Sequence, residues 1–331
     1  MNDLLKKLGI AILVSLSLSN TVLAEIEDES GEEYDEVVGR SPASPASSAL
    51  VWVDTQDIYY YMTNMDRLTK RLGSLDDYRF ADDKTNGLWL RTEQGKFSHQ
   101  KEHFYQLGYN HSSLRNDDIQ WLNGISLNYL KGSHQSYEKG VSLHSTFFNY
   151  QKHYYLDMLL HYGAYKTNIY VSSDDTLSRF THKGKLLKLS LEAGYEKKWE
   201  NNWFLRPQAQ LQFAHTKGKN YMLGNDNHLY ISNASSLVGR LGFELGKNFK
   251  TNHRIFVLGN LYHEFLSSKG TRLHTSNAVT DNSQYPKDWY DIGIGYSYKG
   301  KHFTPYINAE RSFYKHYGNS TRVNAGISYS F

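Results

Sequence analysis

Candidate catalytic residues are few in this sequence and only weakly patterned. Its 15 histidines suggest a metal site or a hydrolase, but no His-Glu-x-x-His motif occurs, and His263-Glu264 is a single dipeptide rather than a pair of metal ligands. Ser142 and His144 resemble part of a serine hydrolase site, yet such a spacing of two positions is common on any strand. The sequence therefore predicts no catalytic residues, no cofactor and no metal site. An enzyme that hydrolyses lipid or peptide is the least favoured function.

Charged side chains with a regular spacing are a stronger signal. In the segments 187–195, 205–213 and 237–245, apolar residues alternate with polar, charged or very small ones. Acidic and basic residues therefore share one face of the predicted strands: Glu192, Arg206, Arg240, Glu244, Glu264 and Glu310, together with Arg91 and Arg322. Opposite charges on one confined face could form ion pairs with each other or with a segment packed against that face.

The elements that position these charges are strands, because an alternation with a period of two is typical of a half-buried strand. The pattern recurs from residue 86 to the end of the chain in about twelve segments. They are 86–97, 102–113, 119–131, 138–150, 152–166, 184–199, 202–216, 236–248, 252–266, 288–298, 302–315 and 321–331. Most of them are much longer than the usual strand of about five or six residues, which argues against a soluble β-sandwich.

The connections between these segments alternate in length. Those near 150–152, 200–202, 249–252 and 299–301 are tight turns, whereas 167–183, 217–235 and 267–287 are long and polar. Short periplasmic turns and long external loops are the topology of a transmembrane barrel, and the 27 tyrosines fit its aromatic girdles. The sequence thus predicts an all-β transmembrane barrel of about 12 antiparallel strands in the outer membrane of a Gram-negative bacterium, with its external loops at the cell surface.

A helix is predicted before the first strand. Apolar residues recur at spacings of three and four from Ile58 to Leu75, and Asp54 or Thr55 is a reasonable N-cap. A helix over residues 55–77 would be about 35 Å long, enough to cross a bilayer. It is too polar to face lipid, so it would have to cross inside something.

The first 24 residues have the features of an export signal. Lys6 and Lys7 precede the short apolar run 10–18, and a small-residue cleavage site ends at Ala24, before Glu25. Residues 25–36 are nearly all acidic, and a Pro/Ser/Ala linker follows, so we expect this part to be disordered. The predicted domains are a signal peptide (1–24), an acidic segment and linker (25–54), a helix and linker (55–85) and a barrel (86–331).

Composition excludes several other classes. The chain has no cysteine, so it has neither a disulfide framework nor thiolate chemistry. Its net charge of +3 and the absence of a basic patch in the sequence give no case for nucleic acid. Its mean hydropathy is −0.63, and no later segment has the run of roughly 18 apolar residues that a membrane helix needs.

Several segments, in order along the chain, resemble the β-domains of bacterial autotransporters, the barrels of type V secretion. They are MDRLTKRLG at 65–73, NGLWLR at 86–91 followed by Gly95, LEAGY at 191–195, WFLRPQAQL at 203–211, LVGRLG at 237–242, HEF at 263–265 and NAGISYSF at 324–331. The resemblance covers residues 55–331, and the opening strand is most similar to the adhesin-type subgroup.

This resemblance implies a barrel of twelve strands whose lumen holds the preceding helix. It implies that the barrel helps to carry an N-terminal passenger to the cell surface. From the charges themselves we expect the inward residues to form ion pairs that hold the helix through Arg67, Lys70 and Arg71. The resemblance also implies biogenesis through the Sec translocon, periplasmic chaperones and the barrel assembly machinery, which reads the terminal residues Ile327, Tyr329 and Phe331. Outer-membrane lipid or lipopolysaccharide would surround a monomeric barrel.

Two departures from the family pattern leave alternatives open. Only residues 25–54 precede the helix, so the passenger is very short, and a stand-alone barrel that acts through its loops, or as a small pore, is the alternative function. Asp66-Arg67 stands where the secreted proteases of the family carry an Asn-Asn cleavage site. Autocatalytic cleavage of the linker by an inward carboxylate thus has no motif to support it.

Overall fold

The computed structural model describes residues 56–73, 85–97, 100–115, 118–132, 135–173, 176–224, 227–250, 252–266, 271–275, 278–281, 286–314 and 318–331. Among these, no helix is both long and apolar enough to cross a membrane. The predicted signal cleavage site at Ala24 and Glu25 and the predicted N-cap at Asp54 or Thr55 lie outside the described residues.

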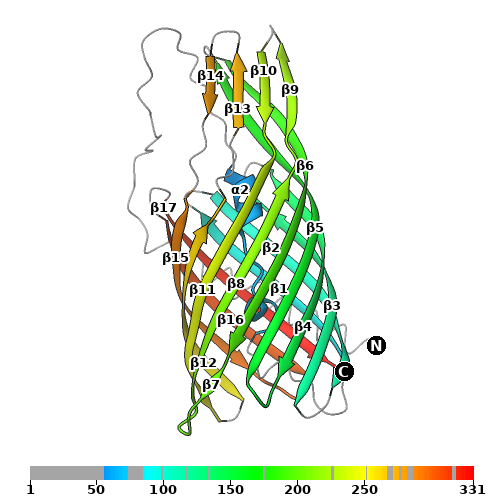
Figure 1. Cartoon of the computed structure of the whole chain (residues 1–331), viewed down its shortest axis with the longest axis vertical. Coiled ribbons are helices and arrows are strands. Elements are labelled where there is room, and N and C mark those ends of the chain that lie inside the picture. The colour runs from blue at the N-terminus through cyan, green and yellow to red at the C-terminus, as the bar shows by residue number, and fades with distance from the viewer. Residues whose placement is uncertain are drawn as a thin grey trace.

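Twelve long antiparallel strands form a closed barrel, which confirms the predicted fold class (Figure 1). They are β1 (Asn86–Phe97), β2 (Gln100–Arg115), β3 (Ile119–Lys131), β4 (Tyr137–Asn149), β5 (Tyr154–Ser173), β6 (Thr176–Tyr195), β8 (Trp203–Thr216), β11 (Ala234–Phe249), β12 (His253–Glu264), β15 (Asp288–Tyr298), β16 (Phe303–Tyr314) and β17 (Gly318–Ser330). Strand β1 pairs with both β2 and β17, so the last strand closes the sheet on the first. A two-residue strand, β7 (Lys197–Lys198), pairs with the start of β8.

Side chains alternate across the barrel wall in the opposite sense to a water-soluble protein. The outward residues Leu241 and Leu261 are 66% and 65% exposed, whereas the charged side chains of Glu192 and Arg206 are fully buried. Backbone groups pair from strand to strand around the closed barrel, which is what a hydrocarbon surrounding requires. The apolar face therefore suits lipid, and the polar face lines the lumen.

The two ends of the barrel differ. Tight turns lie at the end that holds Phe331, and His153, Asn202 and Lys250 take positive φ angles there. At the other end, β5 and β6 extend well beyond the rest of the barrel (Figure 1). By the usual rule for such barrels, the end with tight turns is periplasmic and the extended end is external.

The predicted long loops were wrong in part, because much of their length forms strands. Strands β5 and β6 stay paired up to Ser173 and Thr176, through residues predicted as the loop 167–183. Four short strands form a separate external sheet: β9 (Lys219–Gly224), β10 (Asn227–Ile231), β13 (Thr271–Thr275) and β14 (Ala278–Asp281). The four external strands have only four to six residues each, which is too short for an alternation to be recognised in the sequence.

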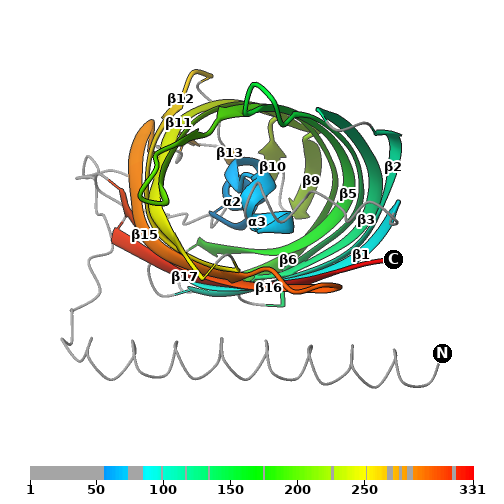
Figure 2. The same ribbon diagram turned by 90° about the horizontal axis from the view of Figure 1, so that it is seen from below.

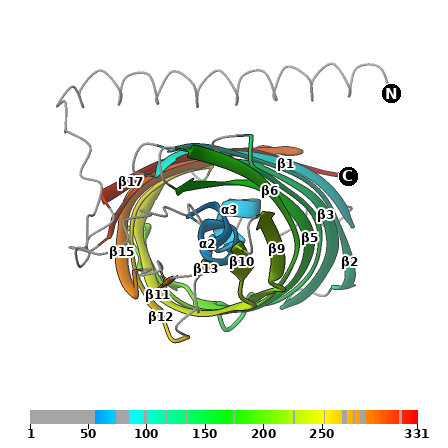
Figure 3. The same cartoon turned by 90° about the horizontal axis from the view of Figure 1, so that it is seen from above.

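Two short helices, α2 (Gln56–Thr63) and α3 (Leu68–Leu72), lie inside the ring of strands (Figures 2 and 3). The prediction of one continuous helix over 55–77 was wrong, since Asn64 to Arg67 are not helical and the second helix ends at Gly73, whose φ is 85°. The residues from 74 to 84, which include the predicted last turn, are outside the described part of the chain. The two helices and the segment between them fill the middle of the lumen.

Candidate functional site: the segment enclosed by the barrel

The enclosed segment, residues 56–73, packs its apolar side chains against both halves of the lumen. Towards the external end, Tyr61 and Met62 of α2 join a buried cluster with Phe104, Leu130 and Tyr165 of the wall. Hydrophobic burial therefore holds α2 in place, because a large apolar side chain contributes roughly 1.5–3 kcal/mol of stability when it is fully buried.

The lower helix is held in the same way near the periplasmic end. Leu68 and Leu72 of α3 contact Trp89 and three further apolar wall residues, Leu122, Phe148 and Tyr155. The indole of Trp89 lies across β2 at Gly108, where a Cβ atom would collide with its ring. A glycine is thus required at this position for the ring to reach the helix.

Three basic side chains of the enclosed segment form ion pairs with the wall. Arg67 bonds Glu310 of β16, and Lys70 lies 2.6 Å from Glu93 of β1. Lys70 also lies 3.8 Å from the second carboxylate oxygen of Glu310. Because all of these side chains are almost fully buried, they are far less screened than surface charges.

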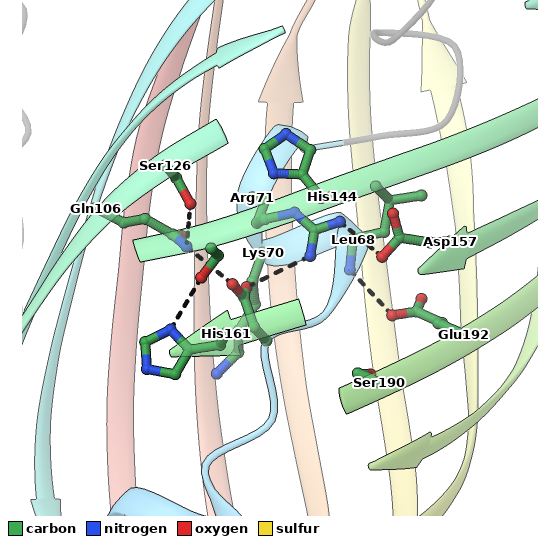
Figure 4. Close-up of polar contacts among 12 residues, drawn as sticks. Leu68, Lys70, Arg71, Gln106, Ser126, His144, Asp157, His161, Ser190 and Glu192 are labelled. Carbon is green, nitrogen blue, oxygen red and sulfur yellow. Dashed lines mark hydrogen bonds and ion pairs between the residues drawn. The ribbon is translucent and has the colours of Figure 1, made fainter. Parts of the chain in front are cut away.

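Arg71 makes the corresponding contact on the other side of the lumen. Its guanidinium donates a hydrogen bond of 2.7 Å to Asp157 of β5 (Figure 4). The same carboxylate accepts a hydrogen bond from Thr146. The backbone N–H of Leu68 donates to Glu192 of β6 at 3.0 Å, as the same view shows. The first turn of α3 therefore gains an acceptor from the wall instead of a side-chain cap of its own.

Asp66, in the segment between the helices, pairs with wall donors. Its two carboxylate oxygens accept hydrogen bonds of 2.9 Å from Arg91 and from Gln106. Arg71 lies 3.9 Å from the same carboxylate. The Asp66 side chain is 17% exposed, so this acid is tied to the wall and partly desolvated.

The break between the helices is stabilised by wall residues that bond its backbone. The carbonyls of Met62, Asn64 and Asp66 accept hydrogen bonds from Gln212 (2.9 Å), Lys188 (3.3 Å) and Gln210 (3.3 Å). Carbonyl groups that leave a helix need new partners when they are buried. Lumenal side chains supply them here, which is the physical reason that the predicted continuous helix is interrupted.

The residues predicted to hold the helix fall into three groups. Arg67, Lys70, Arg71, Glu192 and Glu310 make the helix–wall contacts described above. Arg240 reaches the enclosed segment indirectly, since it lies 3.3 Å from Glu192 and bonds Gln208, Gln210 and Asn260.

In the third group, Arg206, Glu244 and Glu264, the contacts that the structure shows are with other wall residues. Arg206 lies 2.8 Å from Glu244 and also bonds Glu196, and Arg254 lies 3.1 Å from Glu196. Glu264 bonds Ser236 and accepts from the backbone N–H of Leu237. Alternation shows that a side chain points inward, but not the height along the barrel at which it meets the helix.

Sequence reasoning missed three contacts that the same alternation could have indicated. Glu93 is two residues from Arg91 on the inward face of β1, and Asp157 occupies an inward position on β5. Tyr306 donates its hydroxyl to the carbonyls of Lys70 and Arg71, at 2.9 and 2.6 Å. All three positions alternate in phase with inward residues of their strands, so their direction was predictable but their partner was not.

The predicted assembly residues lie at the periplasmic edge of the last strand. Phe331 and Asn86 exchange two backbone hydrogen bonds, of 2.9 and 3.0 Å, where β17 meets β1. The Phe331 side chain is 46% exposed and stacks on Tyr329, with 5.6 Å between the ring centroids. Ile327 is half-buried and pairs with Leu90 of β1. The backbone of Phe331 thus helps to close the barrel, while its side chain stays accessible.

Ser142 and His144, considered above as a hydrolase pair, have separate partners. Ser142 Oγ lies 3.0 Å from Nδ1 of His161, whose Nε2 lies 2.9 Å from Glu138. His144 instead bonds Asn110 at 2.6 Å. Ser142, His161 and Glu138 are all buried in the lumenal wall. Within the described part of the chain, no group of three or more His, Asp or Glu side chains is placed to hold a metal ion.

Comparisons with known proteins point to one family. The family model described as "Autotransporter beta-domain" matches residues 105–310. The BrkA autotransporter of Bordetella pertussis is 31% identical over 96 residues, which are 28% of this chain and 9% of that protein. The pertactin autotransporter of Bordetella parapertussis is 26% identical over 150 residues, 43% of this chain and 16% of that protein. The match thus spans less than a fifth of these relatives.

The fold agrees with a solved autotransporter barrel. The crystal structure of the beta domain of the Bordetella autotransporter BrkA aligns with a TM-score of 0.58 at 21% identity, over 75% of this chain and 100% of that one. The strand number, the closed antiparallel topology and the family match agree with each other. This chain belongs to the autotransporter beta-domain family and is a translocator barrel of the Gram-negative outer membrane.

Proposed function

We propose that this barrel supports the display or secretion of its own N-terminal segment at the cell surface. The observation that carries the proposal is the enclosed segment 56–73, which precedes β1 in the chain and lies inside the lumen. Its first helix packs against the external half of the wall and its second against the periplasmic half. The enclosed segment therefore runs from the external half of the lumen to the periplasmic half, and its N-terminal end faces the external side.

The domain division follows the same path. Residues 1–24 would be removed on export, and 25–54 would be displayed. Residues 55–85 would thread the lumen, and 86–331 would form the barrel.

Biogenesis would require the Sec translocon, periplasmic chaperones and the barrel assembly machinery. The exposed Phe331 side chain at the periplasmic edge supports recognition by that machinery. We propose a monomer, because the barrel closes on itself and leaves no strand edge of its wall open.

Intact cells provide the test of display. An epitope tag placed between residues 36 and 39 should be labelled by antibody on intact cells and removed by added protease. A matched tag in the periplasmic turn at Asn201 should be labelled only after the outer membrane is permeabilised. Equal protection of both tags in intact cells would contradict the proposal.

A small pore is the second candidate, and the packing of the lumen argues against an open one. The space beside the enclosed segment near Arg67, Lys70 and Tyr262 is about 20 Å³. That volume holds about one water molecule, because one requires at least roughly 10–15 Å³. We therefore propose that the barrel is closed to ions at rest.

We also propose that the linker stays uncleaved. The carboxylate of Asp66 is already bonded to Arg91 and Gln106 and is not poised as a free acid or base. Electrophoresis and N-terminal sequencing of the mature protein test this proposal. A single species that begins at Glu25 is expected, and a fragment that begins between residues 64 and 68 would refute it.

A further inference from the structure

Six lysines lie on the outward face of the barrel near the external ends of neighbouring strands. This lysine face consists of Lys131 (β3), Lys139 (β4), Lys166 (β5), Lys183 and Lys185 (β6) and Lys217, which follows β8. Strand pairing places Lys139, Ala164 and Lys185 in one row, and Lys166 beside Lys183 in the row above. All but the half-buried Lys166 are exposed, so the face is a compact basic surface that the linear sequence does not reveal.

In the described part of these strands, no acidic side chain lies on the lysine face. On the described residues of β2 to β6 and β8, the acids point into the lumen, as Glu102, Glu138, Asp157 and Glu192 do. Within the same described residues, none of the six lysines forms an ion pair with a carboxylate. Neighbouring strands are about 4.8 Å apart, so the backbones of the paired Lys166 and Lys183 lie within a Debye length of each other, about 8 Å at physiological salt. Lys139 and Lys185 are two strands apart, about 10 Å. Such a surface favours a ligand with several negative charges.

Aromatic side chains locate the lysine face at the boundary between lipid and water. The rings of Tyr105 and Tyr129 stack with centroids 6.4 Å apart. The Lys139 ammonium lies over the rings of Tyr129 and Tyr137, at 5.6 and 5.1 Å. Tyrosine girdles mark the interfaces of outer-membrane barrels, and lysines there extend their charge into the headgroup layer.

An apolar groove of about 710 Å³ lies on the same strands, on the lipid side of the lysine face. Its centre is the row Leu143, Leu160, Leu189, Phe213 and Leu237, which runs from β4 to β11. Lys185 is four residues external to Leu189, which corresponds to about 13 Å along a strand. The charge and the groove are therefore arranged as a headgroup and its acyl chains would be.

We propose that the lysine face and this groove bind one phosphorylated, multiply acylated lipid of the outer leaflet, the lipid part of lipopolysaccharide. Its phosphates would lie among Lys139, Lys183 and Lys185, and its acyl chains would lie along the groove. The opposite side of the barrel differs, because its external end mixes Arg311 with the exposed pair His263–Asp288. The ligand thus contacts one side of the barrel and orients it in the leaflet.

Native mass spectrometry of the full-length barrel in detergent, titrated with bisphosphorylated lipid A, tests the site. The test variant combines Lys131→Gln, Lys139→Gln, Lys183→Gln and Lys185→Gln. We expect its affinity for lipid A to fall by about tenfold or more, because each basic residue near an anionic headgroup adds to the free energy of binding. A matched control removes lysines from the periplasmic rim (Lys152→Gln, Lys197→Gln and Lys247→Gln) and should bind lipid A as the native chain does.

Three further ligands distinguish the lipid from other anions. Fully deacylated lipid A and inorganic phosphate should bind much more weakly than lipid A, because neither can fill the groove. Phosphatidylglycerol, with one phosphate and two chains, should bind more weakly than lipid A. Unchanged lipid A binding by the test variant, an equal loss in the periplasmic control, or equal affinity for any of the three ligands would overturn the proposal. Heat-dependent gel mobility confirms that each variant is folded.

Discussion

Arg71 of the enclosed helix donates a hydrogen bond of 2.7 Å to Asp157 of the barrel wall, and both side chains are withdrawn from water. The two residues lie 86 positions apart in the chain. This pair fixes the register between a segment that must enter the lumen and a wall that must close around it. A buried ion pair adds little net stability over an apolar pair, but breaking it leaves a buried charge without a partner.

Replacing Asp157 by Asn should therefore destabilise the folded barrel by roughly 3–5 kcal/mol, the typical cost of removing one member of a buried pair. The measurement is urea unfolding of the refolded protein in lipid vesicles, followed by tryptophan fluorescence. Glu200→Gln is the control, because Glu200 is an exposed acid in a periplasmic turn and should change stability by less than about 0.5 kcal/mol.

A double variant tests whether Arg71 and Asp157 stabilise the barrel as a pair. Arg71→Met combined with Asp157→Asn should recover much of the lost stability, because neither change then leaves a charge unpaired. If the double variant is as unstable as the sum of the two single variants, the two side chains are not coupled and the assigned role of the pair is wrong.

Gly108→Ala tests the packing of α3 through the wall. The added methyl group would collide with the indole ring of Trp89, which is 2% exposed and packs on the enclosed helix. Overpacking of this kind costs about 1–3 kcal/mol. The unfolding midpoint in urea should fall accordingly.

Gly259→Ala is the matched control for this change. Its methyl group would meet the ring of Phe243, but that ring is 46% exposed on the lipid side and can rotate away. Equal losses of stability in the two variants would mean that the contact between Trp89 and Gly108 has no special role in holding the helix.

Sequence alternation predicted the barrel well because each strand buries one complete face. Strands β1, β3 and β15 begin and end at the predicted residues. It also predicted that Glu192, Arg240 and Glu310 point inward, since direction depends only on the phase of the strand. The external strands β9, β10, β13 and β14 were not predicted, because they are too short for an alternation to be recognised.

The helix break shows the other limit of local patterns. The apolar spacing from Ile58 to Leu72 is helical throughout, yet Asn64 and Asp66 leave the helix. Their backbone carbonyls are bonded by Lys188 and Gln210, which lie 124 and 144 positions away. No local pattern can include partners at that separation, so the interruption requires the closed barrel.

Phe331 has two separable roles that can be tested in cells. Its backbone exchanges hydrogen bonds with Asn86, whereas its ring is exposed at the periplasmic edge. Phe331→Ala keeps the backbone bonds and removes only the ring. If the assembly machinery reads the ring, Phe331→Ala and deletion of Phe331 should reduce the amount of folded barrel in the outer membrane equally. Heat-dependent gel mobility of membrane fractions measures this amount. Phe249→Ala, an exposed ring at the same end, is the control. Normal assembly of Phe331→Ala would rule out reading of the ring.

Deletion of residues 56–73 should open the lumen to ions. The wall alone forms the closed ring of twelve strands, and the enclosed segment fills the space within it. In planar bilayers the native protein should show little conductance, and the deletion variant should show stable channels. A variant that keeps this length but replaces Arg67, Lys70 and Arg71 by Gln should lie between them, with frequent transient openings, because the plug remains but loses its ion pairs. Identical conductance in all three proteins would mean that the enclosed segment does not block the lumen in the membrane.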